Sequence, residues 1–404
     1  MASGQVRRRE ARSGIGRAAS ALYILVLAAL VAGCGVSAGA GADGTASAAR
    51  PTAPPSTVTP APSGSYAVDV QTAWGPGAAI ALLKSPMDAR HVFVASGITP
   101  DGHALLGFEY VPDASGIAAS PVPAQAGLLD ITSERFTAIG VSSTPNYAPG
   151  CCQSDGRFLV ASDSTAPGAT CGVCHLRLWS YDTTTRQLWQ VAVGSQYGEI
   201  LGAFLSHGLM LLVTGAGDRL YVANLAARTI APLTLSSIPA QTQVFVATFS
   251  WPYLVYNVSQ TNGTLTTYAF DFVTGHNIAL VGVTSLAASS DVQLTGSITG
   301  DTLFFALAPA NGSFTRLYQL DYLMTSGASP RLLATYAAGG EGVQTASDRL
   351  VALRGIVWDR AQSRFVDFGA SMRVLGLAGS FLVVGDQSGA QQLMIYDTSR
   401  LPAH

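Results

Sequence analysis

The chain has 404 residues and a formal net charge of −2, and only 11% of its residues are charged. This balance argues against a protein that depends on a basic surface to bind nucleic acid. Few charges also mean few carboxylates for acid–base chemistry, which disfavours a glycosidase.

The first 33 residues have the pattern of a bacterial export signal. Five arginines lie within the first 17 residues, and residues 18–33 are apolar or small and carry no charge. That run is too short to span a bilayer comfortably, but it fits the apolar region of a signal peptide with a small-residue cleavage site. Removing residues 1–33 takes away five of the 22 basic and one of the 24 acidic residues, so the mature charge is −6. This sign argues against nucleic acid and against an anionic membrane surface as partners.

The segment Leu30-Val31-Ala32-Gly33-Cys34 resembles the lipobox of bacterial lipoproteins. The resemblance implies cleavage between Gly33 and Cys34 and a thioether-linked diacylglycerol on Cys34, with palmitate as a typical acyl group. Two acyl chains on one residue are enough for stable attachment to the cell membrane. The alternative is an uncleaved N-terminal anchor helix. Residues 34–65 then comprise the lipidated cysteine and a flexible linker, because they lack the large apolar groups that form a core.

Residues 66–404 contain repeated short apolar runs. Between residues 200 and 235, four runs rich in β-branched and aromatic residues are separated by three tight turns, which predicts a four-stranded antiparallel meander. The same plan follows in residues 244–283. A polar residue recurs near the end of the third run of each unit at intervals of 38 to 52 residues: Asp130, Asp182, Asn224, Asp271, Asp321, Asp359 and Asp397. We predict that these side chains accept hydrogen bonds from turn backbone amides.

Seven units at this spacing predict an all-β fold, a β-propeller of seven blades with four antiparallel strands each. Six or eight blades and a pair of β-sandwiches are the alternatives. The last unit offers only three strands, whereas residues 66–70 read as an orphan strand. We therefore expect residues 66–70 to pair beside residues 391–397, completing the last blade and closing the ring.

Two short segments resemble known propeller repeats. Residues 269–275 look like the A-x-D-x-x-T-G blade motif of quinoprotein-like propellers, and residues 219–224 are similar to YVTN-type repeats. The resemblance implies the fold and says little of function, because binders and enzymes share these motifs. The adjacent pair Cys151-Cys152 also resembles the disulfide over the quinone of quinoprotein alcohol dehydrogenases. The chain is too short for their eight-bladed domain plus insertions.

Four cysteines remain after Cys34, namely Cys151, Cys152, Cys171 and Cys174. The first two begin the innermost strand of the second unit, and the other two lie in the loop between its second and third strands, so we expect all four at one end of one blade. Two disulfides, each joining one residue of the first pair to one of the second, are favoured for an even count outside the cytoplasm. Four thiolates also fit zinc. Cys171-Gly172-Val173-Cys174-His175 also matches the c-type haem pattern, and a redox-active dithiol is a further alternative.

The other candidates favour structural roles. His207 and His276 fall in predicted turns, and the five tryptophans are expected to fill the space between sheets, with a sugar-stacking platform as the alternative. We therefore expect a monomeric, lipid-anchored extracytoplasmic propeller without cofactor, metal or nucleic acid, which binds an unknown protein or an envelope glycan through its loop-rich face. No catalytic residue is assigned. The opposing hypothesis is an enzyme, either a redox protein with haem or quinone or a lyase or hydrolase in the central channel.

Overall fold

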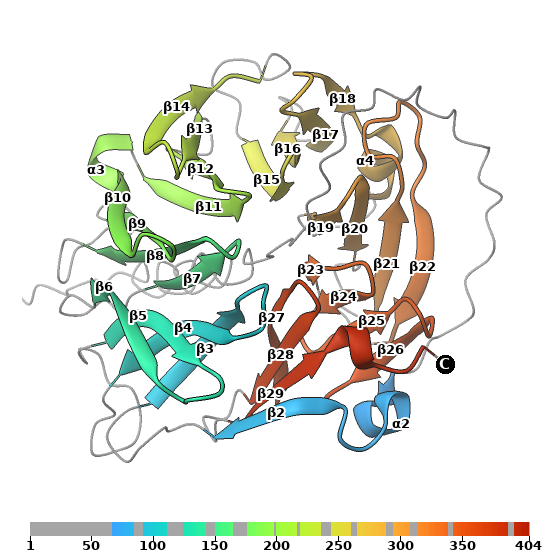
Figure 1. The fold of residues 1–404 in the computed structure, drawn as a ribbon. Coiled ribbons are helices and arrows are strands. Elements are labelled where there is room, and N and C mark those ends of the chain that lie inside the picture. The colour runs from blue at the N-terminus through green and yellow to red at the C-terminus, as the bar shows by residue number, and fades with distance from the viewer. Residues whose placement is uncertain are drawn as a thin grey trace, which may run out of the picture.

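Seven sheets surround a common axis, and the first strand of each lies nearest that axis (Figure 1). The computed structural model describes residues 67–84, 92–110, 124–142, 150–164, 176–197, 199–215, 219–235, 244–259, 265–287, 294–307, 314–337, 342–386 and 392–403. Each sheet contains an antiparallel four-stranded meander whose strands follow the order of the chain, apart from the last blade. The prediction of an all-β propeller with seven blades is confirmed, and six blades, eight blades and paired sandwiches are excluded.

The strands of the first four blades begin after residue 91. Blade one contains β3 (Val92–Ile98), β4 (Ala104–Tyr110), β5 (Ala124–Asp130) and β6 (Phe136–Ser142). Blade two contains β7 (Gly150–Ser154), β8 (Phe158–Ser164), β9 (Leu176–Asp182) and β10 (Gln187–Val193), followed by α3 (Gly194–Tyr197). Blade three contains β11 (Ile200–Ser206), β12 (Leu209–Thr214), β13 (Arg219–Asn224) and β14 (Thr229–Leu233). Blade four contains β15 (Val244–Ser250), β16 (Tyr253–Ser259), β17 (Leu265–Asp271) and β18 (Asn277–Ala279), followed by α4 (Val281–Ala287).

The remaining three blades include strands from both ends of the described chain. Blade five contains β19 (Thr295–Thr299), β20 (Thr302–Leu307), β21 (Thr315–Leu320) and β22 (Arg331–Tyr336). Blade six contains β23 (Val343–Ala346), β24 (Leu350–Leu353), β25 (Ile356–Asp359), β26 (Arg364–Asp367) and the two-residue β1 (Val68–Asp69). Blade seven contains β27 (Met372–Ala378), β28 (Phe381–Asp386), β29 (Gln392–Asp397) and β2 (Ala79–Lys84). The 3-10 turn η2 (Thr398–Arg400) follows β29, and α2 (Val70–Trp74) lies between β1 and β2.

A hydrophobic cluster fills each of the seven spaces between neighbouring blades. Successive side chains of a strand point to opposite faces, so one strand contributes to two clusters. In β9, Leu176 and Leu178 are buried against blade three, whereas Trp179 and Tyr181 pack toward blade one. Each blade therefore buries both faces against its neighbours, and the stability of any one blade depends on closure of the ring.

The ring is closed by a different N-terminal strand from the one that we expected. β2 pairs antiparallel with β29, with Leu83 opposite Leu393, and supplies the outermost strand of blade seven. The described part of the expected closing strand, residues 67–70, does not pair with β29, because β1 pairs in parallel with β26 of blade six. Closure by an N-terminal strand is thus confirmed, and the assignment to residues 66–70 was wrong.

The side chain of Asp69 explains why β1 stops after two residues. Its Oδ1 accepts a hydrogen bond of 2.8 Å from the backbone N–H of Gln71 and one of 3.4 Å from that of Thr72. This N-cap starts α2, and Trp74 at the end of α2 is buried between blades six and seven. The chain then turns outward through residues 75–78 and enters blade seven as β2.

The innermost strands share an irregularity that the sequence patterns did not reveal. In six of the seven blades the first strand shifts register by one residue against the second. In β7 the extra residue is Cys152. Gly376 and Gly97 follow the shift in β27 and β3, and a Cβ on Gly376 would lie 2.8 Å from the Cα of Gly97. Bulges bend a strand, so the inner strands curve where neighbouring blades come closest.

The two faces of the ring differ in the length of their connections. Short turns join the first to the second strand in every blade, as at residues 207–208, and the third to the fourth strand in blades one to four and in blade six, as at residues 183–186. Blade five makes the latter connection through residues 321–330, and in blade seven the third and fourth strands are not consecutive in the chain. The structure describes all of these connections. We call this surface the turn face. Most connections of the opposite, loop-rich face, including residues 111–123 and 165–175, lie outside the described residues. No helix within the described ranges combines the length and apolar character needed to cross a bilayer.

Candidate functional site

The recurring polar positions have a structural role within their own turn in six of the seven blades. Asp271 is typical, because its Oδ1 accepts hydrogen bonds from the backbone N–H groups of Val273 at 2.8 Å and Thr274 at 3.4 Å. The same bonds to backbone amides two or three residues later are made by Asp130, Asp182, Asn224, Asp359 and Asp397. Asp321 differs, since its Oδ1 accepts from the side chains of Thr302 and Gln319. The predicted turn role is therefore confirmed for all but Asp321.

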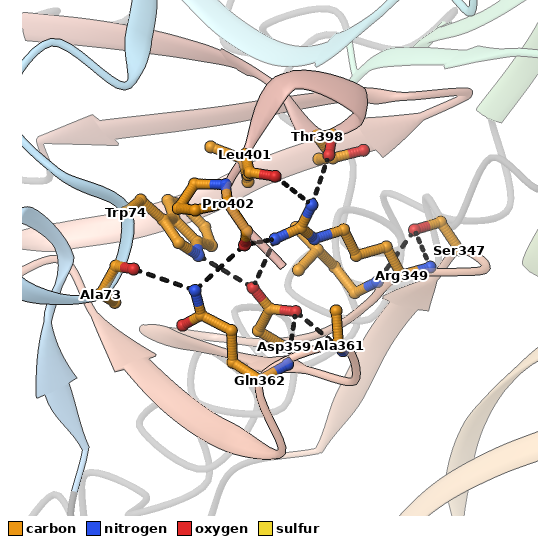
Figure 2. A network of polar contacts seen from close by, with 11 residues as sticks. Ala73, Trp74, Ser347, Arg349, Asp359, Ala361, Gln362, Thr398, Leu401 and Pro402 are labelled. Carbon is orange, nitrogen blue, oxygen red and sulfur yellow. Dashed lines mark hydrogen bonds and ion pairs between the residues drawn. The ribbon is translucent and has the colours of Figure 1, made fainter. Parts of the chain in front are cut away.

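In blade six this turn residue also holds the N-terminal segment. Asp359 is fully buried, and its Oδ2 accepts hydrogen bonds from Trp74 Nε1 at 2.9 Å and from Arg349 Nη2 at 3.1 Å (Figure 2). The contact joins residues 285 positions apart in the chain. A buried carboxylate is stable only when it is paired. Trp74 and Arg349 supply the partners of Asp359, and these contacts fix both side chains in place.

The C-terminal segment is held by the same group of side chains. Arg349 Nη1 donates to the carbonyl oxygens of Thr398 at 3.0 Å and Leu401 at 2.7 Å, as Figure 2 shows. Gln362 Nε2 donates to the carbonyl oxygens of Ala73 and Pro402, both at 3.0 Å. We call Trp74, Arg349, Asp359 and Gln362 the clasp. It ties both ends of the described chain to two turns of blade six, the one between β23 and β24 and the one between β25 and β26, which is a structural task.

A cleft of about 280 Å³ opens on the turn face between blades two and three. One wall comes from blade two, where Ser180, Asp182, Gln187 and Trp189 form a cross-strand array on β9 and β10. The array follows from the period of two along each strand, since Gln187 pairs with Asp182 and Trp189 with Ser180. The opposite wall is the β13–β14 turn of blade three, from Leu225 to Arg228.

Two arginines flank this cleft in different electrostatic settings. Arg157 donates to Asp182 Oδ2 from Nε at 3.2 Å and from Nη2 at 2.8 Å, and its guanidinium lies 4.8 Å from the ring centroid of Phe158. The hydrogen bond from Arg157 lowers the pKa of Asp182 below its ordinary value, and bonds from backbone amides lower it further. Arg228 Nη2 donates to Gln187 Oε1. Arg228 has no carboxylate partner in the part of the chain that the structure describes.

The backbone of the turns positions Arg228. Asn224 Oδ1 accepts from the backbone N–H of Ala227 at 2.9 Å, and four residues after Asn224 the chain adopts a positive φ of 55° at Arg228. The equivalent residue of blade two, Arg186, has φ 58°, and in blade four the position is Gly275 with φ 70°. The residue with positive φ closes the turn that joins the third and fourth strands. It directs Arg228 back over blade two.

The structure places part of the predicted cysteine cluster. Cys34, Cys171, Cys174 and His175 lie outside the described residues, as do the side chains of Cys151 and Cys152. The backbone puts Cys151 and Cys152 in β7, and pairing of Gly150 with Ser162 and of Ser164 with Leu176 places the start of β7 at the same end of the blade as the 165–175 connection. This confirms that Cys151 and Cys152 belong to the innermost strand of blade two, whereas the convergence of all four cysteines stays a prediction. Disulfides, zinc and haem stay predictions. Across the described ranges, no three His, Cys, Asp or Glu side chains form a group suited to a metal ion.

The remaining sequence candidates divide between core and surface. Trp74 and Trp358 are buried between blades as predicted, whereas Trp189 is half-buried and lines the cleft. His207 lies in a turn with its Nδ1 2.9 Å from Ser206 Oγ, and His276 follows a turn, as expected. Sequence reasoning missed Arg228. Its spacing from Asn224, which matches that of Arg186 from Asp182, was the available signal.

Comparisons with known proteins do not assign the chain to a family. No protein-family model and no curated protein matches it. Among solved structures it is similar to TolB from Acinetobacter baumannii, with 14% identity over 69% of this chain and 77% of that chain and a TM-score of 0.40. It is also similar to the RRP9 WD40 repeats, with 12% identity over 78% of this chain and 99% of that chain and a TM-score of 0.45. Hydrazine synthase of Kuenenia stuttgartiensis is 12% identical over 78% of this chain and 97% of that chain, with a TM-score of 0.43. These values carry no argument about function, and the propeller assignment depends on the sheet topology.

Proposed function

We propose that this protein is a lipid-anchored, extracytoplasmic β-propeller that binds a protein or an envelope glycan. The observation that carries the binding role is the polar cleft between blades two and three, which a rigid closed ring holds open on its turn face. The extracytoplasmic location is inferred from the lipobox-like segment that ends at Cys34 and from the linker that follows it.

The carboxylates of the turn face suit hydrogen-bond acceptors better than catalytic acids. Hydrogen bonds from the backbone and hydroxyl of Ser133 lower the pKa of Asp130, and the bond from Arg157 lowers that of Asp182. A general acid that works near neutral pH needs a pKa shifted the other way. This comparison favours binding over proton transfer at these positions.

The anchor is tested by substituting its cysteine. Intact mass and cell fractionation compare the full-length chain with the Cys34→Ser variant. We expect a diacylglycerol-modified, membrane-bound mature chain, and an unmodified variant that leaves the membrane fraction or accumulates uncleaved. An unmodified native chain cleaved at another position would contradict the lipid anchor.

The binding role is tested with the full-length chain in detergent. Saturable binding is measured to two fractions of the cell envelope, one of purified glycan and one of solubilised protein. We expect saturable binding to one of them, and its absence from both contradicts the proposal.

A visible spectrum, metal content and free-thiol count on the same sample separate the alternatives for the cysteines, because a Soret band indicates haem and stoichiometric zinc without disulfides indicates a metal site.

A further inference from the structure

We propose that the cleft between blades two and three binds an acidic saccharide, with a sugar ring against Trp189 and a carboxylate on Arg228. The inference depends on the proposed binding function and deepens it by naming the ligand class. It assigns the ligand to the turn face, whereas the sequence patterns pointed to the loop-rich face.

The size and shape of the cleft suit one or two sugar rings. Its volume of about 280 Å³ lies just below the range, roughly 300–1,000 Å³, that holds drug-sized ligands. Trp189 is half-buried, so its indole is held by packing against blade three while part of it faces the opening. A held aromatic ring with an accessible surface offers the apolar C–H face of a pyranose a place to pack at little entropic cost.

The charge of the site selects an anion. Arg157 is neutralised by its ion pair with Asp182, with N and O atoms 2.8 Å apart. Arg228, on the facing turn, bonds to the neutral amide of Gln187 and to no carboxylate in the described residues. It therefore contributes the unbalanced positive charge of the cleft. Its planar guanidinium has further N–H donors with the spacing to hold a carboxylate through two hydrogen bonds.

The other polar groups of the wall favour a saccharide over a peptide side chain. The hydroxyls of Ser180 and Thr185 and the amide of Gln187 line the cleft beside Trp189. Such groups donate to and accept from the hydroxyls of a sugar. An apolar peptide side chain in the same place would remove them from water without replacing their hydrogen bonds, which costs free energy. A ring that carries both hydroxyls and a carboxylate matches the aromatic, the neutral polar and the unpaired cationic groups of this lining.

The test measures affinity by titration calorimetry, and by intrinsic tryptophan fluorescence as a second readout, on the full-length chain in detergent. The probes are digalacturonate, the neutral disaccharide galactobiose and the acidic peptide N-acetyl-Glu-Glu. We expect digalacturonate to bind most tightly and added salt to weaken its binding. Arg228→Gln should weaken digalacturonate about tenfold to a hundredfold, as expected for loss of charge-assisted bonds, and leave galactobiose unchanged.

Two further variants separate recognition from folding. Trp189→Ala should weaken both saccharides, and Trp189→Phe should restore part of the affinity because an aromatic surface is kept. Arg186→Gln is the matched control, since Arg186 occupies the equivalent turn position of blade two but does not line the cleft. Unfolding midpoints of all variants show whether each one is folded.

Three results would overturn the inference. They are equal affinity for digalacturonate and galactobiose, tighter binding of N-acetyl-Glu-Glu than of digalacturonate, and an Arg228→Gln variant that binds digalacturonate like the native chain. If the saccharides fail while saturable binding to an envelope fraction persists, the ligand class is wrong and the binding function stands. If neither the saccharides nor an envelope fraction binds, the proposed binding function is wrong as well.

Discussion

Asp359→Ala should destabilise the ring more than any other substitution among the recurring turn residues. Asp359 is 0% exposed and accepts from Trp74 Nε1, from Arg349 Nη2 and from the backbone N–H groups of Ala361 and Gln362. Truncation leaves the guanidinium of Arg349, whose side chain is only 18% exposed, without its carboxylate. Removing one partner of a buried ion pair costs about 3–5 kcal/mol.

The expected change is large enough to measure by thermal unfolding. With an unfolding entropy of about 2.1 cal/mol/K per residue, a loss of 1 kcal/mol lowers the midpoint of a domain the size of residues 66–404 by roughly 1.4 °C. The variant should therefore melt about 4–7 °C below the native chain. Asp130→Ala is the matched control. Asp130 occupies the same position in blade one and makes the same turn bonds, from Thr132 and Ser133, but has no arginine partner in the described residues.

A double-mutant cycle with Arg349→Met isolates the ion pair. We expect the two substitutions to couple by about 1 kcal/mol or more, because residues in one buried network are not additive. The reasoning is refuted if Asp359→Ala and Asp130→Ala lower the midpoint equally, or if the changes for Asp359→Ala and Arg349→Met simply add.

Three further predictions concern closure, packing and pH. A chain that begins at residue 79 keeps β2 and should elute as a monomer from a sizing column, whereas one that begins at residue 85 leaves the edge of β29 unpaired and should aggregate. Gly376→Ala should lower the free energy of unfolding in urea by about 1–3 kcal/mol, because the new Cβ would meet the backbone of Gly97. Gly202→Ala should lower it less, because the nearest neighbour of its Cβ is a side-chain atom of Phe204 at 3.3 Å. Equal losses for the two variants would contradict this reasoning. Arg157 lowers the pKa of Asp182 in the folded state. The stabilisation that ionised Asp182 provides is therefore fully present above the pKa of about 4 that the group has in the unfolded chain, and it is lost as pH falls through the lower pKa of the folded state. The stability difference between the native chain and Asp182→Asn should therefore shrink between about pH 6 and pH 2.5 in urea titrations, and a constant difference would refute the assignment.

Some features of the structure follow from local patterns, and the sequence predicted these well. Strand alternation and tight turns are encoded within a few residues, so the seven meanders and six of the seven turn roles could be recognised. Asp321 escaped because its partners, Thr302 and Gln319, belong to neighbouring strands rather than to its own turn.

The closing strand shows where such patterns fail. Residues 66–70 and 79–84 are both short, mostly apolar runs. The choice between them depends on the cap at Asp69 and on the bond from Trp74 to Asp359 across the whole ring. The cleft is a similar case, since Arg157, Asp182 and Arg228 are far apart in the chain and come together only because blades two and three stack in one register.

By itself the sequence determined the number and plan of the blades, because hydrogen bonds within a meander connect neighbouring segments of the chain. The tertiary structure alone decided which strand closes the ring, which acidic side chain is buried and which arginine lacks a carboxylate partner in the described residues. Those outcomes depend on contacts between blades and between the two ends of the chain. Packing and burial of charge at these contacts involve segments that are far apart in the sequence and that no local pattern relates.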